Sequence, residues 1–197
     1  MIEYYEGVIE TIENAIESIQ TDAYERIISE SVDVLKNGNK IIASGLGKNV
    51  PICEKFVGTL NSLGIDARFL HTNTAVHGDL GIVGKNDIVY LLSKGGNTYE
   101  TVALAEQLKA RGTDTWLMTF TERCKSAEII DKRFIMHLLN EGDEWDIVPN
   151  NSTTVYLIVL QGIAIEIGRR LSITLDDFKV NHPGGGIGAR LNGKDLW

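Results

Sequence analysis

The feature that most constrains the fold of this chain is the alternation of short apolar runs with longer segments of helical periodicity. The apolar runs are strand-like and lie at residues 41–43, 67–70, 88–92, 115–118 and 134–138. The helical segments lie between and after them, at residues 48–63, 98–111, 125–130 and 152–171. Five such units predict an α/β fold, a three-layer α-β-α sandwich in which helices cover both faces of a five-stranded parallel sheet.

Two further helices are expected before the first strand. Residues 2–20 place Ile and Tyr at three- and four-residue intervals, with Glu at other positions, as in an amphipathic helix. A second helix is expected over residues 22–36, with Thr21 as its N-cap and Asn37-Gly38 as its stop. Together they predict an N-terminal helical hairpin that serves packing or subunit contacts.

The length of the chain and the lack of a linker indicate a single structural domain. A chain of 197 residues is in the range of one compact unit with its own core. We therefore expect residues 1–38 to form the hairpin and to pack on an α/β domain of residues 39–197. The segment 152–171 is apolar nearly all round, which predicts that it is central to the domain or buried against another subunit.

Charge and hydropathy exclude several classes of partner. The formal net charge of -8 repels polyanions, and the longest basic cluster is the pair Arg169-Arg170, so no nucleic acid is expected. The longest apolar stretch, 155–167, is too short for a membrane span, and the N-terminus lacks the pattern of a signal peptide. We therefore expect a cytoplasmic protein without membrane contact. Cys53 and Cys124 lack metal-like spacing and are expected to be reduced thiols.

The first of two turns that suit a phosphate follows the first strand and opens a helix. It reads S-G-L-G-K-N over residues 44–49, and glycines there permit close approach of an anion to unpaired N–H groups. A dinucleotide site is the obvious rival. However, Val50 stands where that motif has its third glycine, and the next strand ends in Phe69-Leu70-His71 rather than in an acid. We interpret Ser44, Gly45 and Gly47 as phosphate-binding residues.

The second turn follows the most apolar strand and reads S-K-G-G-N-T over residues 93–98. Two hydroxyl groups flank a glycine pair at the start of a helix, and Lys94 adds a positive charge, so the turn forms a compact anion cradle. A flexible loop with a capping Thr is the alternative, but two such turns on neighbouring parallel strands favour a phosphate site. The predicted phosphate ligands here are Ser93, Lys94, Gly95 and Thr98.

Three polar residues outside these turns indicate a catalytic site only when they are considered together. His77 lies in a polar turn before a strand, Glu141 follows another strand, and His182 precedes a third glycine-rich turn, H-P-G-G-G. Singly, each His is more often a hydrogen-bonded structural residue than a catalyst. The pKa of imidazole nevertheless suits proton transfer near neutral pH.

From Ser44 onward, the order of motifs resembles the SIS (sugar isomerase) domain family, and most closely its arabinose-5-phosphate isomerase branch. The resemblance is carried by G-L-G-K (45–48), H-G-D-L-G (77–81), S-K-G-G-N-T-Y-E (93–100), P-N-N-S-T-T (149–154) and H-P-G-G-G-I-G-A-R-L (182–191). It implies a five-stranded, flavodoxin-like sandwich, a homotetramer, and interconversion of an aldose phosphate and a ketose phosphate without a cofactor. In this branch the pair is ribulose 5-phosphate and arabinose 5-phosphate.

Carried over residue by residue, the resemblance implies that the functional residues are Lys48, His77, Glu100, Glu141 and His182. Our hypothesis makes Glu141 the base and His182 the ring-opening acid or base. Lys48, His77 and Glu100 would orient and polarise the sugar hydroxyls. The set Lys48, Glu100, Glu141 and His182 could also collect Zn²⁺, which we expect to inhibit rather than to be required.

The sequence departs from the family pattern at three places. Gly95 stands where the phosphate turn usually has a middle Ser, which removes one hydroxyl contact. The acidic segment G-D-E-W-D-I-V at 142–148 replaces a more apolar stretch. Enzymes of this branch continue into paired CBS domains, whereas this sequence ends soon after its last motif, so regulation by that module is not expected.

Two other functions remain open at this point. One is a different isomerase of the same superfamily, acting on a hexulose or heptose phosphate. The other is a non-catalytic domain that senses a sugar phosphate, although the acidic N-terminal hairpin does not resemble the basic DNA-binding domain of a regulator.

Overall fold

A parallel sheet of five strands forms the centre of the protein, whose computed structural model describes residues 2–193. The strands are β1 (Ile41–Gly45), β2 (Ala67–His71), β3 (Ile88–Leu92), β4 (Asp114–Thr119) and β5 (Lys132–Ile135). Their order is β2-β1-β3-β4-β5, which is the flavodoxin-like order, and every neighbouring pair is parallel. The predicted five-stranded parallel sheet is confirmed. Residues 194–197 of the predicted domain and Met1 of the predicted hairpin lie outside the described residues.

The last strand is the one whose predicted position was wrong. It was expected at residues 134–138 and begins instead at Lys132, pairing with β4 from Trp116 onward. The Lys132 ammonium lies 2.6 Å from Asp114 and 2.9 Å from Glu30, and these contacts hold a charged residue at the start of a strand. A strand predicted from a run of apolar residues leaves out a lysine. The acidic partners that stabilise Lys132 in the strand are distant in sequence, so the local pattern does not indicate them.

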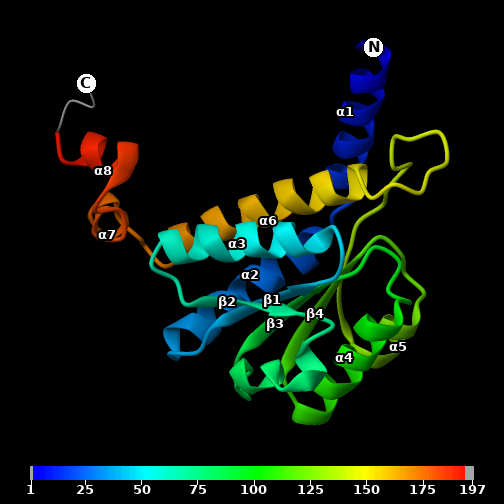
Figure 1. Ribbon diagram of the computed structural model, residues 1–197, viewed down its shortest axis with the longest axis horizontal. Helices are drawn as coiled ribbons and strands as arrows, with labels where there is room; N and C mark the ends of the chain where they lie inside the picture. The colour runs from blue at the N-terminus through cyan, green and yellow to red at the C-terminus, as the bar shows by residue number, and fades with distance from the viewer. Residues whose placement is uncertain (1, 194–197) are drawn as a thin grey trace.

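Helices cover both faces of the sheet, as Figure 1 shows. One layer holds α2 (Thr21–Lys36), α3 (Asn49–Ser62) and α6 (Asn151–Arg170), and the other holds α4 (Tyr99–Arg111) and α5 (Lys125–Ile129). Successive strand residues point to opposite faces. Ile88, Tyr90 and Leu92 of β3 therefore join the core under α2, α3 and α6, whereas Val89 and Leu91 join the core under α4 and α5.

The two N-terminal helices are present as predicted, and both pack against α6. The first, α1 (Ile2–Glu17), extends beyond the body of the domain in Figure 1 and buries Thr11 and Ala15. The second begins at Thr21, so Gln20 is the N-cap and the prediction of Thr21 as the cap was wrong by one residue. The Tyr24 N–H donates to the Gln20 carbonyl, which starts the helix one residue earlier than expected.

A buried hydrogen bond joins α2 to the sheet. The Ser31 hydroxyl lies 2.7 Å from the Tyr90 hydroxyl and donates to the Ile27 carbonyl, so Tyr90 must be the donor to Ser31. Both side chains are fully buried, and the Tyr90 ring also stacks on Phe56 of α3. This contact positions two helices of one layer over the middle of the sheet.

Replacing Tyr90 with Phe is expected to lower the free energy of unfolding by about 1 kcal/mol, because one buried hydrogen bond is lost while the ring stays packed. Urea denaturation followed by circular dichroism measures the change. Tyr99→Phe is the control, since Tyr99 is 82% exposed. Equal losses in the two variants would contradict this account of the core.

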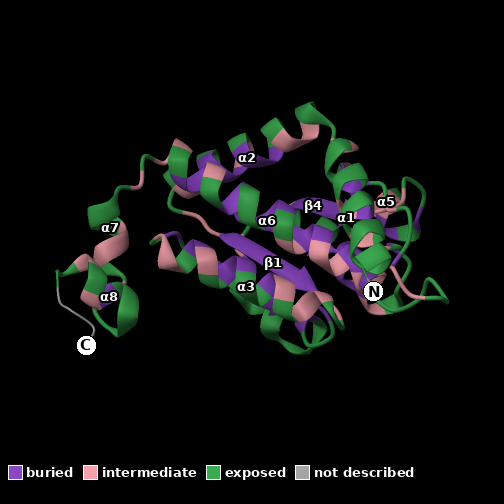
Figure 2. Cartoon of the chain, turned by 90° about the horizontal axis from the view of Figure 1, so that it is seen from above, coloured by how far each residue is buried: buried purple, intermediate pink, exposed green. Residues whose placement is uncertain are grey.

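Two short helices at the C-terminal end were not predicted. The helices α7 (Leu175–Val180) and α8 (Gly185–Leu191) follow α6 and stand off the body of the domain in both Figure 1 and Figure 2. Thr174 and Asp177 form a capping box that starts α7. The third glycine-rich turn is therefore shorter than expected, because Gly185 and Gly186 already open α8. Across residues 2–193, no helix combines the length and the apolarity that a bilayer crossing needs.

Candidate functional site

The candidate site lies where the strand order reverses, at the carboxyl ends of β1 and β3. The chain leaves β1 toward β2 on one side and leaves β3 toward β4 on the other, so the two loops diverge and leave a crevice. A cavity of about 260 Å³ opens there, lined by these loops and by the chain between β5 and α6. It brings together seven of the predicted site residues: Gly47, Lys48, Ser93, Lys94, Gly95, Thr98 and Glu141.

The loop after β3 is held in one conformation by its own residues and by its neighbours. The Gly96 N–H donates to the Ser93 hydroxyl at 3.1 Å, and the Lys94 carbonyl accepts from the Phe120 N–H. Gly96 has a φ of +61°, and a Cβ there would overlap the sulfur of Cys124. Only glycine fits this position. Within residues 2–193, no side chain caps the first turn of α4, so its N–H groups remain available to an anion.

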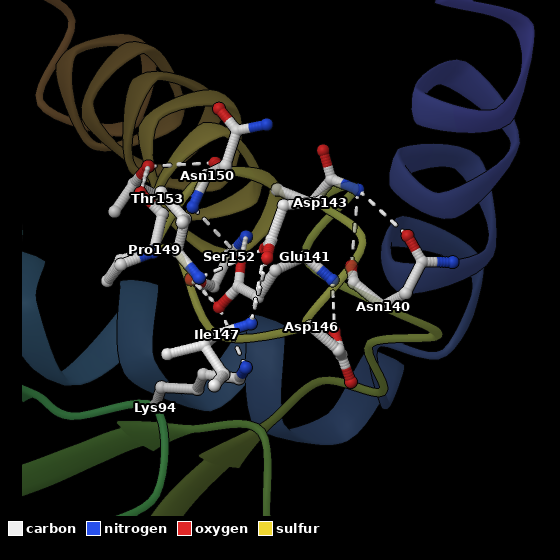
Figure 3. A network of polar contacts seen from close by, with 12 residues as sticks. Lys94, Asn140, Glu141, Asp143, Asp146, Ile147, Pro149, Asn150, Ser152 and Thr153 are labelled. Carbon is white, nitrogen blue, oxygen red and sulfur yellow. Dashed lines mark hydrogen bonds and ion pairs between the residues drawn. The ribbon is translucent and has the colours of Figure 1, made fainter. Parts of the chain in front are cut away.

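Glu141 joins three segments of the chain through one carboxylate, as Figure 3 shows. Its Oε2 accepts from the backbone N–H groups of Asn150 and Ser152 at 3.0 and 2.9 Å, at the start of α6. Its Oε1 accepts from the Ser152 hydroxyl at 2.7 Å and lies 2.8 Å from the Lys94 ammonium. The side chain of Glu141 is fully buried. It is therefore both a wall of the cavity and the N-terminal cap of α6.

These donors decide the charge of the carboxyl group. Burial by itself raises the pKa of Glu141, because it disfavours the charged form. The hydrogen bond from Lys94 and those from Ser152 and Asn150 outweigh burial and hold the pKa below its ordinary value of 4.5. Glu141 is consequently a carboxylate at neutral pH.

The acidic segment 142–148 forms the loop that closes one side of the cavity. The Asp143 carboxylate accepts from the backbone N–H groups of Ile147 and Val148 at 3.1 and 3.0 Å, and Asp146 accepts from the Glu141 N–H at 2.6 Å. These bonds fold the segment so that Ile147 lines the cavity (Figure 3). The acids that distinguish this segment from the usual apolar one thus shape the loop.

Five predicted residues do not line the cavity. Ser44 is buried within β1 and bonds to Thr72, and a Cβ at Gly45 would collide with Asn49, so this glycine serves close packing of β1 against α3. His77 lies in an exposed 3₁₀ turn, Ala75–His77, after β2, and Glu100 lies in the first turn of α4.

His182 lies at the opposite end of the molecule from Glu141. The helix α6 begins beside Glu141 and its 20 residues span about 30 Å before the chain enters α7. His182 follows α7, where its ring stacks on Phe178 and its Nδ1 contacts the Phe178 carbonyl at 2.8 Å. One chain therefore does not unite His182 with the cavity. Figure 1 shows α7 and α8 beyond the C-terminal end of α6.

Sequence reasoning missed several cavity residues. Asn49, Thr101 and Ser152 line it, and Ser152 donates directly to Glu141. The motif P-N-N-S-T-T was a signal for Ser152, but only the fold shows that its hydroxyl meets a carboxylate 11 residues away. Among residues 2–193, no three His, Cys, Asp or Glu side chains gather into a group that could hold a metal ion. The predicted zinc ligands therefore do not meet within one chain.

Comparison with known proteins shows which family has both this fold and these motifs. A profile described as the SIS domain matches residues 34–166. The chain belongs to the SIS domain family. The resemblance found in the sequence is thereby confirmed.

Two curated relatives and one solved structure are similar to this SIS domain. The arabinose 5-phosphate isomerase KdsD of Pseudomonas aeruginosa is 29% identical over 178 residues, which are 90% of this chain and 55% of that protein. KpsF of Escherichia coli, also called arabinose 5-phosphate isomerase, is 29% identical over 91% of this chain and 56% of its own. The chain thus spans about half the length of these relatives. The structure of Escherichia coli CFT073 c3406 in complex with arabinose 5-phosphate is 30% identical, with a TM-score of 0.83, and the match covers 91% of this chain and 94% of that one.

The two adjacent glycines of the SIS domain loop are expected to respond oppositely to substitution. Gly95 has open space around its Cβ position, so Gly95→Ser should fold normally and add a hydroxyl to the anion cradle. One added hydrogen bond should tighten phosphate binding by about 2- to 10-fold. Gly96→Ala should abolish binding and lower the melting temperature, because the loop must move away from Cys124. Calorimetric titration with inorganic phosphate and thermal melts test both, and a folded, phosphate-binding Gly96→Ala variant would contradict the loop geometry.

The stability provided by Glu141 should depend on pH in one direction. Because folding lowers the pKa of Glu141, its contribution is present above pH 4.5, the ordinary value, and is lost as the pH falls through the folded-state value. Glu141→Gln should therefore cost about 1–3 kcal/mol at pH 7, since an amide nitrogen would face other donors. The cost should shrink below pH 4.5. Denaturant unfolding of both proteins from pH 3.5 to 7 measures it, and a pH-independent difference would be the contrary result.

Proposed function

We propose that this SIS domain is a phosphosugar isomerase that interconverts D-ribulose 5-phosphate and D-arabinose 5-phosphate. The observation that carries the proposal is that one cavity is lined by residues of the anion cradle 93–98 together with Lys48 and Glu141. The names of KdsD and KpsF and the arabinose 5-phosphate bound to c3406 support the choice of sugar. The small volume of the cavity suits one sugar phosphate rather than a dinucleotide.

In this proposal the phosphate ester binds to the loop after β3. The N–H groups at the start of α4, together with the hydroxyls of Ser93 and Thr98, supply donors that need no net positive protein charge. Lys48 and Lys94 supply the local positive charge. This explains how a chain with a net charge of -8 can bind a dianion.

The remaining chemistry is proton transfer between two carbons. A carboxylate at Glu141 removes the proton from C1 of ribulose 5-phosphate, and the electrons of that bond form an enediolate with the C2 carbonyl. Return of the proton to C2, with transfer of the O1 hydroxyl proton to O2, gives the aldose. Lys48 stabilises the charge on the enediolate oxygen. His77 and Glu100 lie at the same edge of the sheet but outside the cavity, and they would orient sugar hydroxyls that extend beyond it.

The proposed role of His182 in ring opening requires a second copy of the chain. His182 and Glu141 of one chain lie at opposite ends of α6, so the histidine of another subunit must enter the cavity. We therefore propose a homo-oligomer, and specifically the tetramer expected from the resemblance. Exposed apolar residues on α1 and α7, such as Ile9 and Val180, are available for the contacts between copies.

The first test is turnover of the EDTA-treated protein with D-ribulose 5-phosphate, followed by NMR for arabinose 5-phosphate and other pentose phosphates. Lys48→Met should lower kcat by about 100-fold or more, because one group that stabilises the enediolate charge is lost. Lys55→Met is the matched control. Lys55 lies on α3, the helix that Lys48 precedes as N-cap, but it bonds to Thr59 and Gln161 on the surface, so its loss should change kcat less than twofold.

The outcomes separate the possible functions. Formation of arabinose 5-phosphate that depends on Lys48 supports the proposal. Isomerisation of a hexulose or heptose phosphate alone would assign a different substrate. Stabilisation by ribulose 5-phosphate without any product would indicate a sensor and contradict the isomerase.

A further inference from the structure

The ion pair between Lys94 and Glu141 blocks the oxygen that the proposed reaction needs. Oε2 of Glu141 accepts from two backbone N–H groups at the start of α6, and Oε1 accepts from the Ser152 hydroxyl at 2.7 Å. Oε1 has one accepted hydrogen bond from the helix where Oε2 has two, so it is the oxygen with a position left for a proton from the sugar. The Lys94 ammonium lies 2.8 Å from Oε1. The side chain of Lys94 is 42% exposed and that of Glu141 is 0% exposed, so the ammonium is the outer member of the pair.

Lys94 belongs to the loop that would bind the phosphate. Its backbone is fixed, because its carbonyl accepts from the Thr119 hydroxyl at 2.9 Å and from the Phe120 N–H at 3.1 Å. Its side chain has four flexible carbons and carries three N–H donors, so the ammonium can turn without movement of the loop. A dianion on this loop offers it twice the charge of a carboxylate.

We propose that Lys94 couples phosphate binding to catalysis: the bound phosphate dianion draws the Lys94 ammonium away from Glu141 and thereby exposes Oε1 to the sugar. The inference rests on the proposed function and assigns Lys94 as a positioning residue. A sugar without phosphate would meet a carboxylate still covered by Lys94. The enzyme would thus discriminate against unphosphorylated sugars in the rate of proton transfer as well as in binding.

The charges around Glu141 determine the direction of this effect. Its titratable neighbours are Lys94 and Lys48 across the cavity, Asp143 and Asp146 on its own loop, and Tyr156 of α6. Of these, Lys94 contributes the strongest hydrogen bond that lowers the pKa of Glu141. When Lys94 leaves, burial remains and the pKa rises, so Glu141 becomes a stronger base.

Proton balance is kept throughout the step. Lys94 retains its proton and only changes partner, from the carboxylate to a phosphate oxygen. The proton from C1 of the sugar goes to Oε1 of Glu141, and the carbon-hydrogen bonding electrons enter the enediolate. Glu141 returns a proton to C2, while the proton of the O1 hydroxyl moves to O2, so that C1 becomes the carbonyl carbon. Exchange of the proton on Glu141 with solvent before this return places deuterium on the sugar. Product release lets Lys94 pair with Glu141 again.

The kinetic test uses D-ribulose, which lacks the phosphate, with phosphite as a separate dianion. Exchange of the C1 hydrogen into D₂O is followed by NMR. In the wild-type protein phosphite should accelerate exchange by about tenfold or more, because the base becomes available. In Lys94→Met, exchange should be insensitive to phosphite, and its rate without phosphite should exceed that of the wild type, because Oε1 is no longer covered by the ammonium. Lys94→Arg keeps the charge and should retain the activation, as should the control Lys55→Met.

A second measurement does not depend on turnover. Protein labelled with [5-¹³C]glutamate reports the pKa of Glu141, whose resonance is assigned by its loss in Glu141→Gln. Sulfate, which stays a dianion from pH 3.5 to 7, should raise that pKa in the wild type. In Lys94→Met the pKa should start higher and should not respond to sulfate.

The two experiments distinguish failure of the inference from failure of the proposed function. Phosphite activation that survives in Lys94→Met, or a Glu141 pKa unmoved by sulfate in the wild type, would overturn the role of Lys94. A wild-type protein that turns over no phosphosugar but shows the sulfate effect would reject the isomerase assignment while keeping the coupling of the pair to an anion.

Discussion

The carboxylate of Glu141 is the interaction on which the site depends. It accepts from two backbone N–H groups and a hydroxyl at the start of α6, and it pairs with Lys94 from the loop after β3. A buried carboxylate is stable only when such donors surround it, so the loop, the helix and the segment 141–150 must keep their relative positions. The same requirement that stabilises the fold therefore sets the geometry of the cavity.

The sheet determines where the cavity lies, and the loops at its edge provide the polar groups that line it. Parallel strands present their carboxyl ends at one edge, and the reversal of direction between β1 and β3 opens a crevice there. Gly96 lets the loop after β3 pass close to Cys124, and α4 then begins with unpaired N–H groups. This arrangement can bind an anion although the chain as a whole is acidic. The donors for the anion are backbone N–H groups more than a cluster of basic side chains.

Much of the fold was predictable because its pattern is local. The strand Ile88–Leu92 was predicted to the residue, since a continuous apolar run bounded by polar residues reports a strand buried on both faces. The start of β5 was not, because Lys132 is stabilised by Asp114 and Glu30 from other elements. The short helices α7 and α8 were missed, because glycine-rich sequence predicts a turn and a capping box alone is a weak signal.

The features of the candidate site also divide into those that the sequence predicts and those that only the tertiary structure shows. By itself, the sequence determined the residue types at the strand ends, the glycines and hydroxyls of the loop 93–98, and the presence of a carboxylate after β5. Only the tertiary structure decided that Gly45 serves packing against Asn49, that Ser152 and Lys94 hold Glu141, and that His182 lies at the far end of α6. The physical reason is range: strand and turn preferences act over a few residues, whereas a buried carboxylate and the ends of a long helix are placed by contacts between segments far apart in the chain.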